Sequence, residues 1–266
     1  MQVIANLSLL FTELPLLQRI GAARQAGFAG VEIQFPYAVS AYQLRDELLA
    51  QQMPLYLINL PAGDLMEGGA GLACQPDMRS EFSQALESAL EYALIAKPKM
   101  VNVLAGRLLP GQSFDAAMVC LAANLRDAAR AFARQHCLVT CEAINPFDMP
   151  GFLLNTPQQL LQLLREVRQD NCLAQLDLYH MARQEIDLLA AIDELAGKIG
   201  HVQFADCPGR NEPGTGTLDF MAVRKKLAEA GYGGVWAAEY IPSASTATTL
   251  GWLQQPAFST GENHAE

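Results

Sequence analysis

Short apolar runs alternate along the chain with longer stretches that have the apolar spacing of amphipathic helices. Runs of the length expected for buried strands lie at residues 3–7, 31–35, 55–59, 100–104, 138–143, 173–177, 201–205 and 235–240. Helical stretches between them lie at residues 16–25, 42–51, 81–96, 114–134, 157–168, 187–196 and 220–230. Strand–helix alternation favours right-handed crossovers between parallel strands. Eight such units, with no visible domain linker, predict a single α/β domain, a (β/α)8 TIM barrel.

The barrel is predicted to occupy residues 1–253, and local signals agree with its helices. Thr156-Pro157 supplies an N-cap followed by proline at the first helical position, and Gly27 and Gly231 follow helices where a left-handed residue is expected. Residues 254–266 are rich in small and polar residues and are expected to form a flexible tail. Two long loops, 60–80 and 206–218, follow strands and are expected to overhang one end of the barrel.

Four polar residues stand near the C-terminal ends of four predicted strands: Glu142, Asp177, Gln203 and Glu239. In a barrel of parallel strands these ends converge on the face where catalysis occurs. Three carboxylates and an amide oxygen would repel one another there unless a cation lay between them. The sequence therefore predicts a divalent metal site made of these four residues. Mg²⁺ or Mn²⁺ suits a ligand set made only of oxygen atoms.

Two of these residues, Glu142 and Glu239, end strands that face each other across a closed barrel. A single carboxylate at a strand end is as often a helix cap or a surface charge, but the set of four favours chemistry. Two glutamates on opposite faces of a planar enediol could move a proton between adjacent carbons while a metal ion stabilises the enediolate. His180 and Arg210 follow Asp177 and Gln203 and suit substrate contact, although each also fits a purely structural role.

Composition narrows the class of protein. The chain has 266 residues, 51% of them hydrophobic, which allows a sizeable core, and a formal net charge of −10, which argues against a nucleic-acid partner. Its six cysteines form no Cys-x-x-Cys pair and are expected to be reduced core thiols. There is no signal-peptide pattern and no apolar stretch of about 18 residues, so a cytoplasmic protein without membrane contact is expected.

At these residues the chain resembles the hydroxypyruvate isomerase family, within the xylose isomerase-like barrels. The resemblance runs over residues 1–253 and is carried by several motifs: Ala5-Asn-Leu-Ser8, Phe35-Pro-Tyr37, Asn59-Leu-Pro-Ala-Gly-Asp64, Glu142-Ala-Ile-Asn145, Phe147-Asp-Met-Pro-Gly-Phe152, Asp177-Leu-Tyr-His-Met181, Gly200-His-Val-Gln203 and Arg210-Asn-Glu-Pro-Gly-Thr-Gly216. It implies a metal-dependent enzyme that interconverts hydroxypyruvate and tartronate semialdehyde. It also implies the roles of single residues: Glu142 and Glu239 as the catalytic pair, Asp177 and Gln203 as further metal ligands, and His180, Arg210 and Asp148 as substrate contacts.

The chain departs from the family pattern at three positions near the expected site. Ile58 and Pro146 stand where relatives often have histidine, and Ile241 stands where they commonly have lysine. Because of these departures, three kinds of substrate stay open: a three-carbon acid, a 2-oxo-tetronate, and a ketose that the enzyme would epimerise. Two other classes also stay open: a nucleic-acid enzyme with the same barrel type, and a non-catalytic barrel that binds a sugar acid. The oligomeric state is open as well, with a homo-oligomer among the options.

Overall fold

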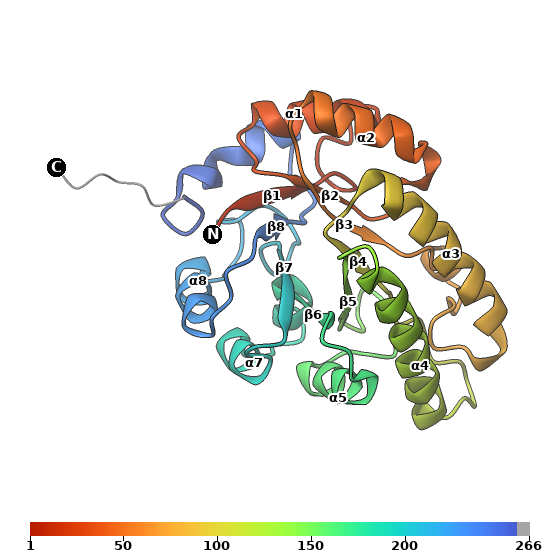
Figure 1. Cartoon of the computed structure of the whole chain (residues 1–266). Helices are drawn as coiled ribbons and strands as arrows, with labels where there is room; N and C mark the ends of the chain where they lie inside the picture. The colour runs from red at the N-terminus through yellow and green to blue at the C-terminus, as the bar shows by residue number, and fades with distance from the viewer. Residues whose placement is uncertain (260–266) are drawn as a thin grey trace.

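The computed structural model describes residues 1–259, which form a closed barrel of eight parallel strands surrounded by helices (Figure 1). The strands are β1 (Val3–Asn6), β2 (Val31–Ile33), β3 (Leu55–Asn59), β4 (Met100–Asn102), β5 (Leu138–Glu142), β6 (Cys172–Asp177), β7 (Ile199–Phe204) and β8 (Trp236–Ala238). Each strand pairs in parallel with the next, and β8 pairs with β1 to close the barrel. The predicted fold class is therefore confirmed, and every predicted strand is present within two residues of its expected ends.

Helices follow the strands on the outside of the barrel. They are α1 (Leu16–Gln25), α2 (Ala41–Ala50), α3 (Arg79–Ala96), α4 (Phe114–Ala133), α5 (Pro157–Val167), α6 (Leu178–Ala182), α7 (Leu188–Glu194) and α8 (Phe220–Glu229). Short 3-10 helices lie at η1 (Pro36–Ala38), η2 (Leu65–Glu67), η3 (Pro76–Met78) and η4 (Thr246–Gln254). All seven predicted helices are confirmed. The pattern missed α6, which has only five residues, and the four 3-10 helices.

Local signals begin and end the helices as expected. Thr156 and Gln159 form a capping box at the start of α5, with Pro157 at its first position. Gly27 and Gly231 have φ angles of 92° and 80°, in the left-handed region that residues other than glycine rarely adopt.

The C-terminal segment lies on the outside of the barrel between α8 and α1 (Figure 1). Instead of a last α-helix, η4 follows β8, and the rings of Trp252 and Phe258 pack against each other with centroids 4.7 Å apart. Phe204 and Trp236 also contact Phe258, so this aromatic cluster is buried. The packed chain thus extends beyond residue 253, into the segment predicted to be a tail, because Phe258 buries its ring there. Predicted tail residues 260–266 lie outside the described part of the chain.

Two further expectations concern the whole described chain. All six cysteines are buried and unpaired, as reduced core thiols should be. Among residues 1–259, no helix has both the length and the apolar character needed to span a bilayer.

Candidate active site at the C-terminal ends of the strands

A cavity of about 240 Å³ opens at the C-terminal ends of the strands. Most of the residues predicted for the site line it: Glu142, Asp148, His180, Arg210 and Glu239. Asp177 and Gln203, the remaining two, are register partners near the C-terminal ends of β6 and β7, and both side chains are buried. The predicted side chains therefore come from four strands and the loops that follow them. A cavity of this size is small for a ligand site and suits a compact substrate.

Glu142 ends β5 and its side chain is buried. Asn102 Nδ2 donates a hydrogen bond of 2.7 Å to Glu142 Oε1. Burial and the nearby charge of Asp177 raise the pKa of Glu142 to about 8, although the hydrogen bond from Asn102 opposes the shift. In the absence of a cation, Glu142 is therefore mostly protonated at neutral pH.

Glu239 directly follows β8 and is held by three donors. Asn6 Nδ2 lies 3.0 Å from Oε2, while Gln34 Nε2 and Arg210 Nη2 lie 3.1 and 2.8 Å from Oε1. Burial raises the pKa of Glu239 well above its usual range, and the charge of Asp177 adds to the rise, whereas the guanidinium of Arg210 lowers it. The two glutamates thus differ, because only Glu239 has a cationic partner in direct contact.

Glu142, Asp177 and His180 form the group that could hold a metal ion among the described residues, since their ligand atoms lie within 4.8 Å of one another. Asp177 caps α6 by accepting the backbone N–H of His180, and its other oxygen lies 3.6 Å from His180 Nε2. His180 was predicted to contact substrate. In the structure its imidazole nitrogen lies beside the predicted oxygen ligands and could itself bind a metal ion. The four-residue ligand set of Glu142, Asp177, Gln203 and Glu239 stays a prediction.

Gln203 is engaged on both sides of its amide. Its Nε2 donates to Glu32 Oε1 over 2.8 Å, and its Oε1 accepts from Gln175 Nε2 over 2.6 Å. Glu32 and Gln175 were not predicted as site residues, because both lie inside predicted strands, where an isolated polar residue carries little signal. They belong to a polar layer beneath the cavity.

His180 is oriented by a loop residue that the pattern did not single out. Asn145 Nδ2 lies 2.7 Å from His180 Nδ1 and 3.1 Å from Asp148 Oδ2. When Asn145 donates to Nδ1, the ring proton sits on Nε2 and faces the cavity side, toward Asp177. Burial lowers the pKa of His180, which favours this neutral form. Tyr179 Oη donates to the same oxygen of Asp148, so the Asp148 carboxylate is also fixed.

Arg210 is delivered by the predicted long loop 206–218. Its φ of 57° is in the left-handed region, and its guanidinium carbon lies 5.1 Å from the centroid of the Tyr179 ring. Asp206 holds the loop, because its carboxylate accepts the backbone N–H groups of Gly214, Gly216 and Leu218. Within residues 1–259, Arg210 Nε has no hydrogen-bond partner although it is buried, which leaves one donor for a ligand.

Part of the cavity lining is apolar and includes Phe35, Met66, Leu104, Ile144 and Met149. Met66 comes from the second predicted long loop, 60–80, so both long loops reach the cavity as expected. A ligand in this cavity therefore meets carboxylates, one guanidinium and one imidazole as well as apolar side chains.

The three departures from the family pattern differ in position. Ile58 is fully buried within β3, and Pro146 is exposed in the loop after β5. Ile241 is 52% exposed, and its backbone N–H donates to the carbonyl of Arg210 over 2.8 Å. Position 241 therefore borders the active-site arginine, whereas position 58 belongs to the core.

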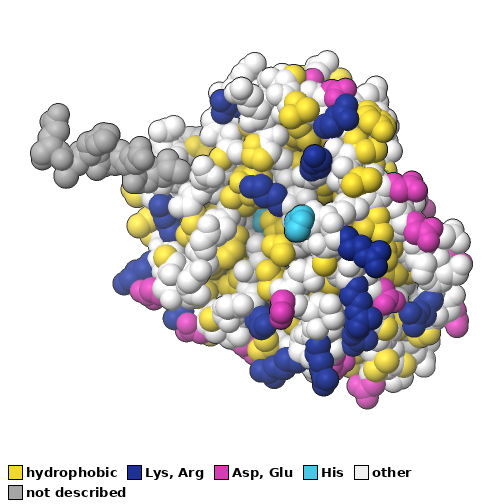
Figure 2. Space-filling view, in the orientation of Figure 1, with side chains coloured by type: hydrophobic (Ala, Val, Ile, Leu, Met, Phe, Trp, Pro, Cys, Tyr) yellow, Lys and Arg dark blue, Asp and Glu magenta, His cyan; other side chains and the backbone are white. Residues whose placement is uncertain are grey.

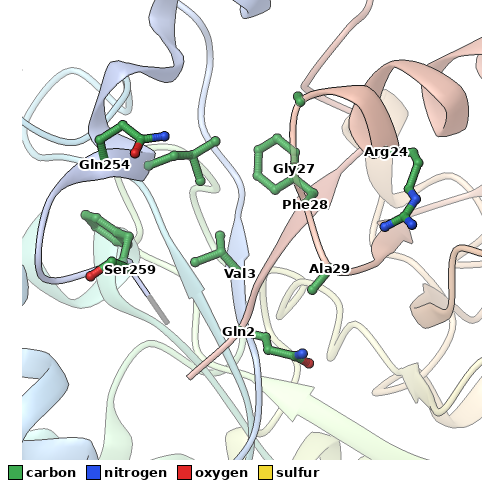
Figure 3. A pocket seen from close by; sticks show the side chains of 11 residues that line it. Gln2, Val3, Arg24, Gly27, Phe28, Ala29, Gln254 and Ser259 are labelled. Atoms are coloured by element: carbon green, nitrogen blue, oxygen red, sulfur yellow. The ribbon is translucent and has the colours of Figure 1, made fainter. Parts of the chain in front are cut away.

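A larger cavity of about 570 Å³ lies where β1 begins, at the other end of the barrel (Figure 3). Gln2, Arg24, Phe28, Gln254 and Ser259 are among its lining residues. Arg24 is the one charged side chain that lines it in the described chain, so it has no acid–base pair. The smaller cavity, by contrast, is lined by glutamates, a histidine and an arginine, and is therefore the candidate active site.

The sequence matches the family model described as "Xylose isomerase-like TIM barrel" over residues 20–255. The chain belongs to this family. A hydroxypyruvate isomerase of Escherichia coli K12 is 39% identical over 249 residues, which cover 94% of this chain and 96% of the relative. A 2-oxo-tetronate isomerase of Cupriavidus necator is 37% identical over 253 residues, covering 94% and 96%. A crystal structure from Brucella melitensis, described as an AP endonuclease of family 2, superposes with a TM-score of 0.91 at 33% identity, covering 95% and 97%.

Proposed function

We propose that this member of the xylose isomerase-like family is a metal-dependent isomerase of a small hydroxy-oxo acid. The observation that carries the proposal is the pair of buried glutamates, Glu142 and Glu239, which line one small cavity and both have raised pKa values. Raised pKa values bring carboxyl groups toward the range in which they can both accept and donate protons at neutral pH. The isomerase relatives support the same reaction class.

The two glutamates differ in a way that assigns their roles. Burial raises the pKa of Glu239, but Arg210 at 2.8 Å opposes that rise and a bound cation would oppose it further. As the carboxylate, Glu239 takes the C–H proton from the carbon that carries the substrate hydroxyl group. The electrons of that bond form the carbon–carbon double bond of an enediolate, and the former carbonyl oxygen takes the negative charge. Glu142 donates its proton to the former carbonyl carbon, while the hydroxyl proton moves from one substrate oxygen to the other. The substrate is isomerised, and the two glutamates exchange protons with solvent before the next cycle.

The residues fit a hard divalent cation. Glu142 and Asp177 are buried carboxylates beside His180, and the charge of Asp177 raises the pKa of both glutamates, a repulsion that a cation would relieve. Glu142, Asp177, Gln203 and Glu239 would hold the ion, with His180 adjacent. A bound cation supplies charge stabilisation for the two substrate oxygens. His180 Nε2 and Arg210 Nε remain to orient those oxygens.

Hydroxypyruvate, interconverted with tartronate semialdehyde, is the first substrate that we propose. 2-Oxo-tetronate is the second, because the named relatives include both isomerases at similar identity. The test is turnover by purified protein supplied with Mg²⁺ or Mn²⁺ on hydroxypyruvate, on four-carbon 2-oxo acids and on ketoses. Turnover of an acid supports the isomerase, turnover of a ketose supports an epimerase, and binding without turnover supports a non-catalytic barrel.

The Brucella structure raises a second candidate, an enzyme that cleaves DNA at abasic sites. Against it, the chain carries a net charge of −10 and only four histidines. Basic side chains do gather over the α3–α5 side of one face (Figure 2). Arg130 of α4 and Arg165 of α5 lie in the last turns of their helices, where positive charge offsets the helix dipole. Incubation with an oligonucleotide that contains one abasic site is expected to leave it intact.

Arg210→Lys is expected to lower kcat/KM by about tenfold or more, even though the charge is kept. Arginine contacts Glu239 through Nη2 while Nε stays available, and its plane lies over Tyr179. A single ammonium group cannot do both. Steady-state kinetics check this, with Arg45→Lys on the exposed side of α2 as the matched control. Wild-type kinetics in Arg210→Lys and in His180→Ala would show that neither residue contacts substrate.

Ile241→Lys is expected to raise kcat/KM for hydroxypyruvate by about 10- to 100-fold. The rise in kcat/KM for a longer hydroxy-oxo acid should be smaller. One charge-assisted contact contributes roughly 1.5–3 kcal/mol, and a lysine beside Arg210 would add such a contact for a compact, highly charged acid. The wild type should accordingly prefer the longer acid, which also gains from the apolar part of the cavity lining. Kinetics on both substrates in both proteins check this. If hydroxypyruvate is already the best substrate and lysine changes nothing, the isoleucine is neutral.

A further inference from the structure

Beneath the cavity lies a fully buried carboxylate, Glu32, which ends up among amide donors rather than solvent. Asn6 Nδ2 and Gln203 Nε2 both donate to Glu32 Oε1 over 2.8 Å. The ring of His201, also fully buried, approaches the other oxygen, with Nε2 2.6 Å from Oε2. Three contacts from β1 and β7 therefore converge on one side chain of β2.

These contacts decide which way two amides point. Because Nε2 of Gln203 is drawn to Glu32, its carbonyl oxygen must face away from Glu32, the orientation that a metal ligand or an acceptor needs. Asn6 is constrained in the same way, since its Nδ2 donates to both Glu32 Oε1 and Glu239 Oε2. Its Oδ1 meanwhile accepts the backbone N–H of Ser8. Glu32 is thus the acceptor that the two amide groups share, in addition to the contacts of Gln203 Oε1 with Gln175 and of Asn6 Oδ1 with Ser8.

His201 completes the arrangement by occupying Oε2. Within residues 1–259, its Nδ1 has no hydrogen-bond partner. An unprotonated Nδ1 avoids leaving a buried N–H unpaired, so the proton belongs on Nε2, where it is donated to Glu32. The carboxylate is thereby held by one oxygen, and the other stays turned toward the two amides.

We propose that Glu32 and His201 form a positioning pair that orients Gln203 and, through Asn6, Glu239. The inference rests on the proposed function, because it concerns how that same site is kept ready. Glu32 is not a catalytic residue, since it lies below the cavity and acts only through the side chains that it holds. Residues that orient ligands in this way typically contribute about 10–100-fold in metal affinity or activity.

Two substitutions separate the position of the acceptor from its charge. Glu32→Asp keeps the charge but withdraws the carboxylate by one methylene, out of reach of the amides. It is expected to lower kcat and to weaken Mn²⁺ binding, each by about 10–100-fold, with KM little changed. Glu32→Gln loses the charge but keeps an oxygen where Oε1 lies. It is expected to keep kcat and Mn²⁺ binding close to wild type, because both amides keep their acceptor. Its melting temperature should fall, because His201 must then accept from the new amide and leave its own buried Nδ1–H unpaired.

The measurements are Mn²⁺ titration of metal-free protein by calorimetry, kcat and KM, and the melting temperature. Asn171→Ala is the matched control, since Asn171 Nδ2 donates to the backbone of Ala129, away from the cavity, and should alter only stability. A wild-type protein that binds no Mn²⁺ overturns the proposed function and this inference together. A wild type that binds Mn²⁺, with Glu32→Asp unaffected or with Glu32→Gln the more damaged of the two in kcat and Mn²⁺ binding, overturns this inference alone.

Discussion

Glu142→Gln and Glu239→Gln are each expected to lower kcat by about 10³-fold or more. One positioned acid or base typically contributes 10²–10⁴-fold, and here the same carboxylates would also hold the metal ion, so the loss should be at the high end. Glutamine keeps the shape and, at position 142, the oxygen that accepts from Asn102. Turnover under saturating substrate and metal checks the prediction. Glu229→Gln, on the exposed surface of α8, is the control. Near-normal activity in either active-site variant would remove that glutamate from the mechanism.

Glu142→Gln should lose activity but gain stability. A variant that is inactive and yet more stable shows that activity is lost with the carboxyl group and not through unfolding. The pKa of Glu142 is about 8 in the folded protein against 4.5 for the ordinary group. Between these values the unfolded state has released the proton and the folded state has kept it, so the ionisation makes the metal-free protein less stable as pH rises. Glutamine abolishes this dependence. The metal-free variant should be more stable than the wild type at pH 7 by up to about 3 kcal/mol, and the two should converge below about pH 4.5. Denaturant unfolding at several pH values checks this.

Chelation of divalent metal is expected to abolish turnover, and Mg²⁺ or Mn²⁺ should restore it with one ion per chain. The reason is electrostatic: the buried glutamates lie near Asp177, whose charge raises the pKa of both, and a cation would relieve this repulsion.

The position of the ion gives the sharper test. Anomalous scattering from crystals soaked in Mn²⁺ should place the ion within bonding distance of Glu142, Asp177, Gln203 and Glu239. An ion elsewhere, or full activity after exhaustive chelation, would contradict the metal site. An ion bound by His180 in place of Gln203 would correct the ligand set and shift the expected metal preference toward ions that accept nitrogen.

The barrel and the strand-end residues could be predicted because their signals are local. Strands and helices are recognised from the spacing of apolar residues at neighbouring positions. Eight strand–helix units commonly close into one arrangement, the (β/α)8 barrel. Once the strands are parallel, residues such as Glu142 and Glu239 must lie at the same end of the barrel. These predictions depend on no single contact between distant residues. The predicted ends of the helices and strands accordingly lie within two residues of those in the structure.

Only the tertiary structure decided how those side chains are held. Asn6 contacts Glu239 across 233 positions in the sequence, and His201 contacts Glu32 across 169. Phe258 is buried rather than part of a free tail because its ring meets Phe204 and Trp236. Which amide hydrogen faces which carboxylate, and which carboxylate has a cation beside it, depends on barrel closure and on the loops above it. Contacts between residues so far apart in the sequence cannot be predicted from local periodicity, because they form only when the eighth strand pairs with the first.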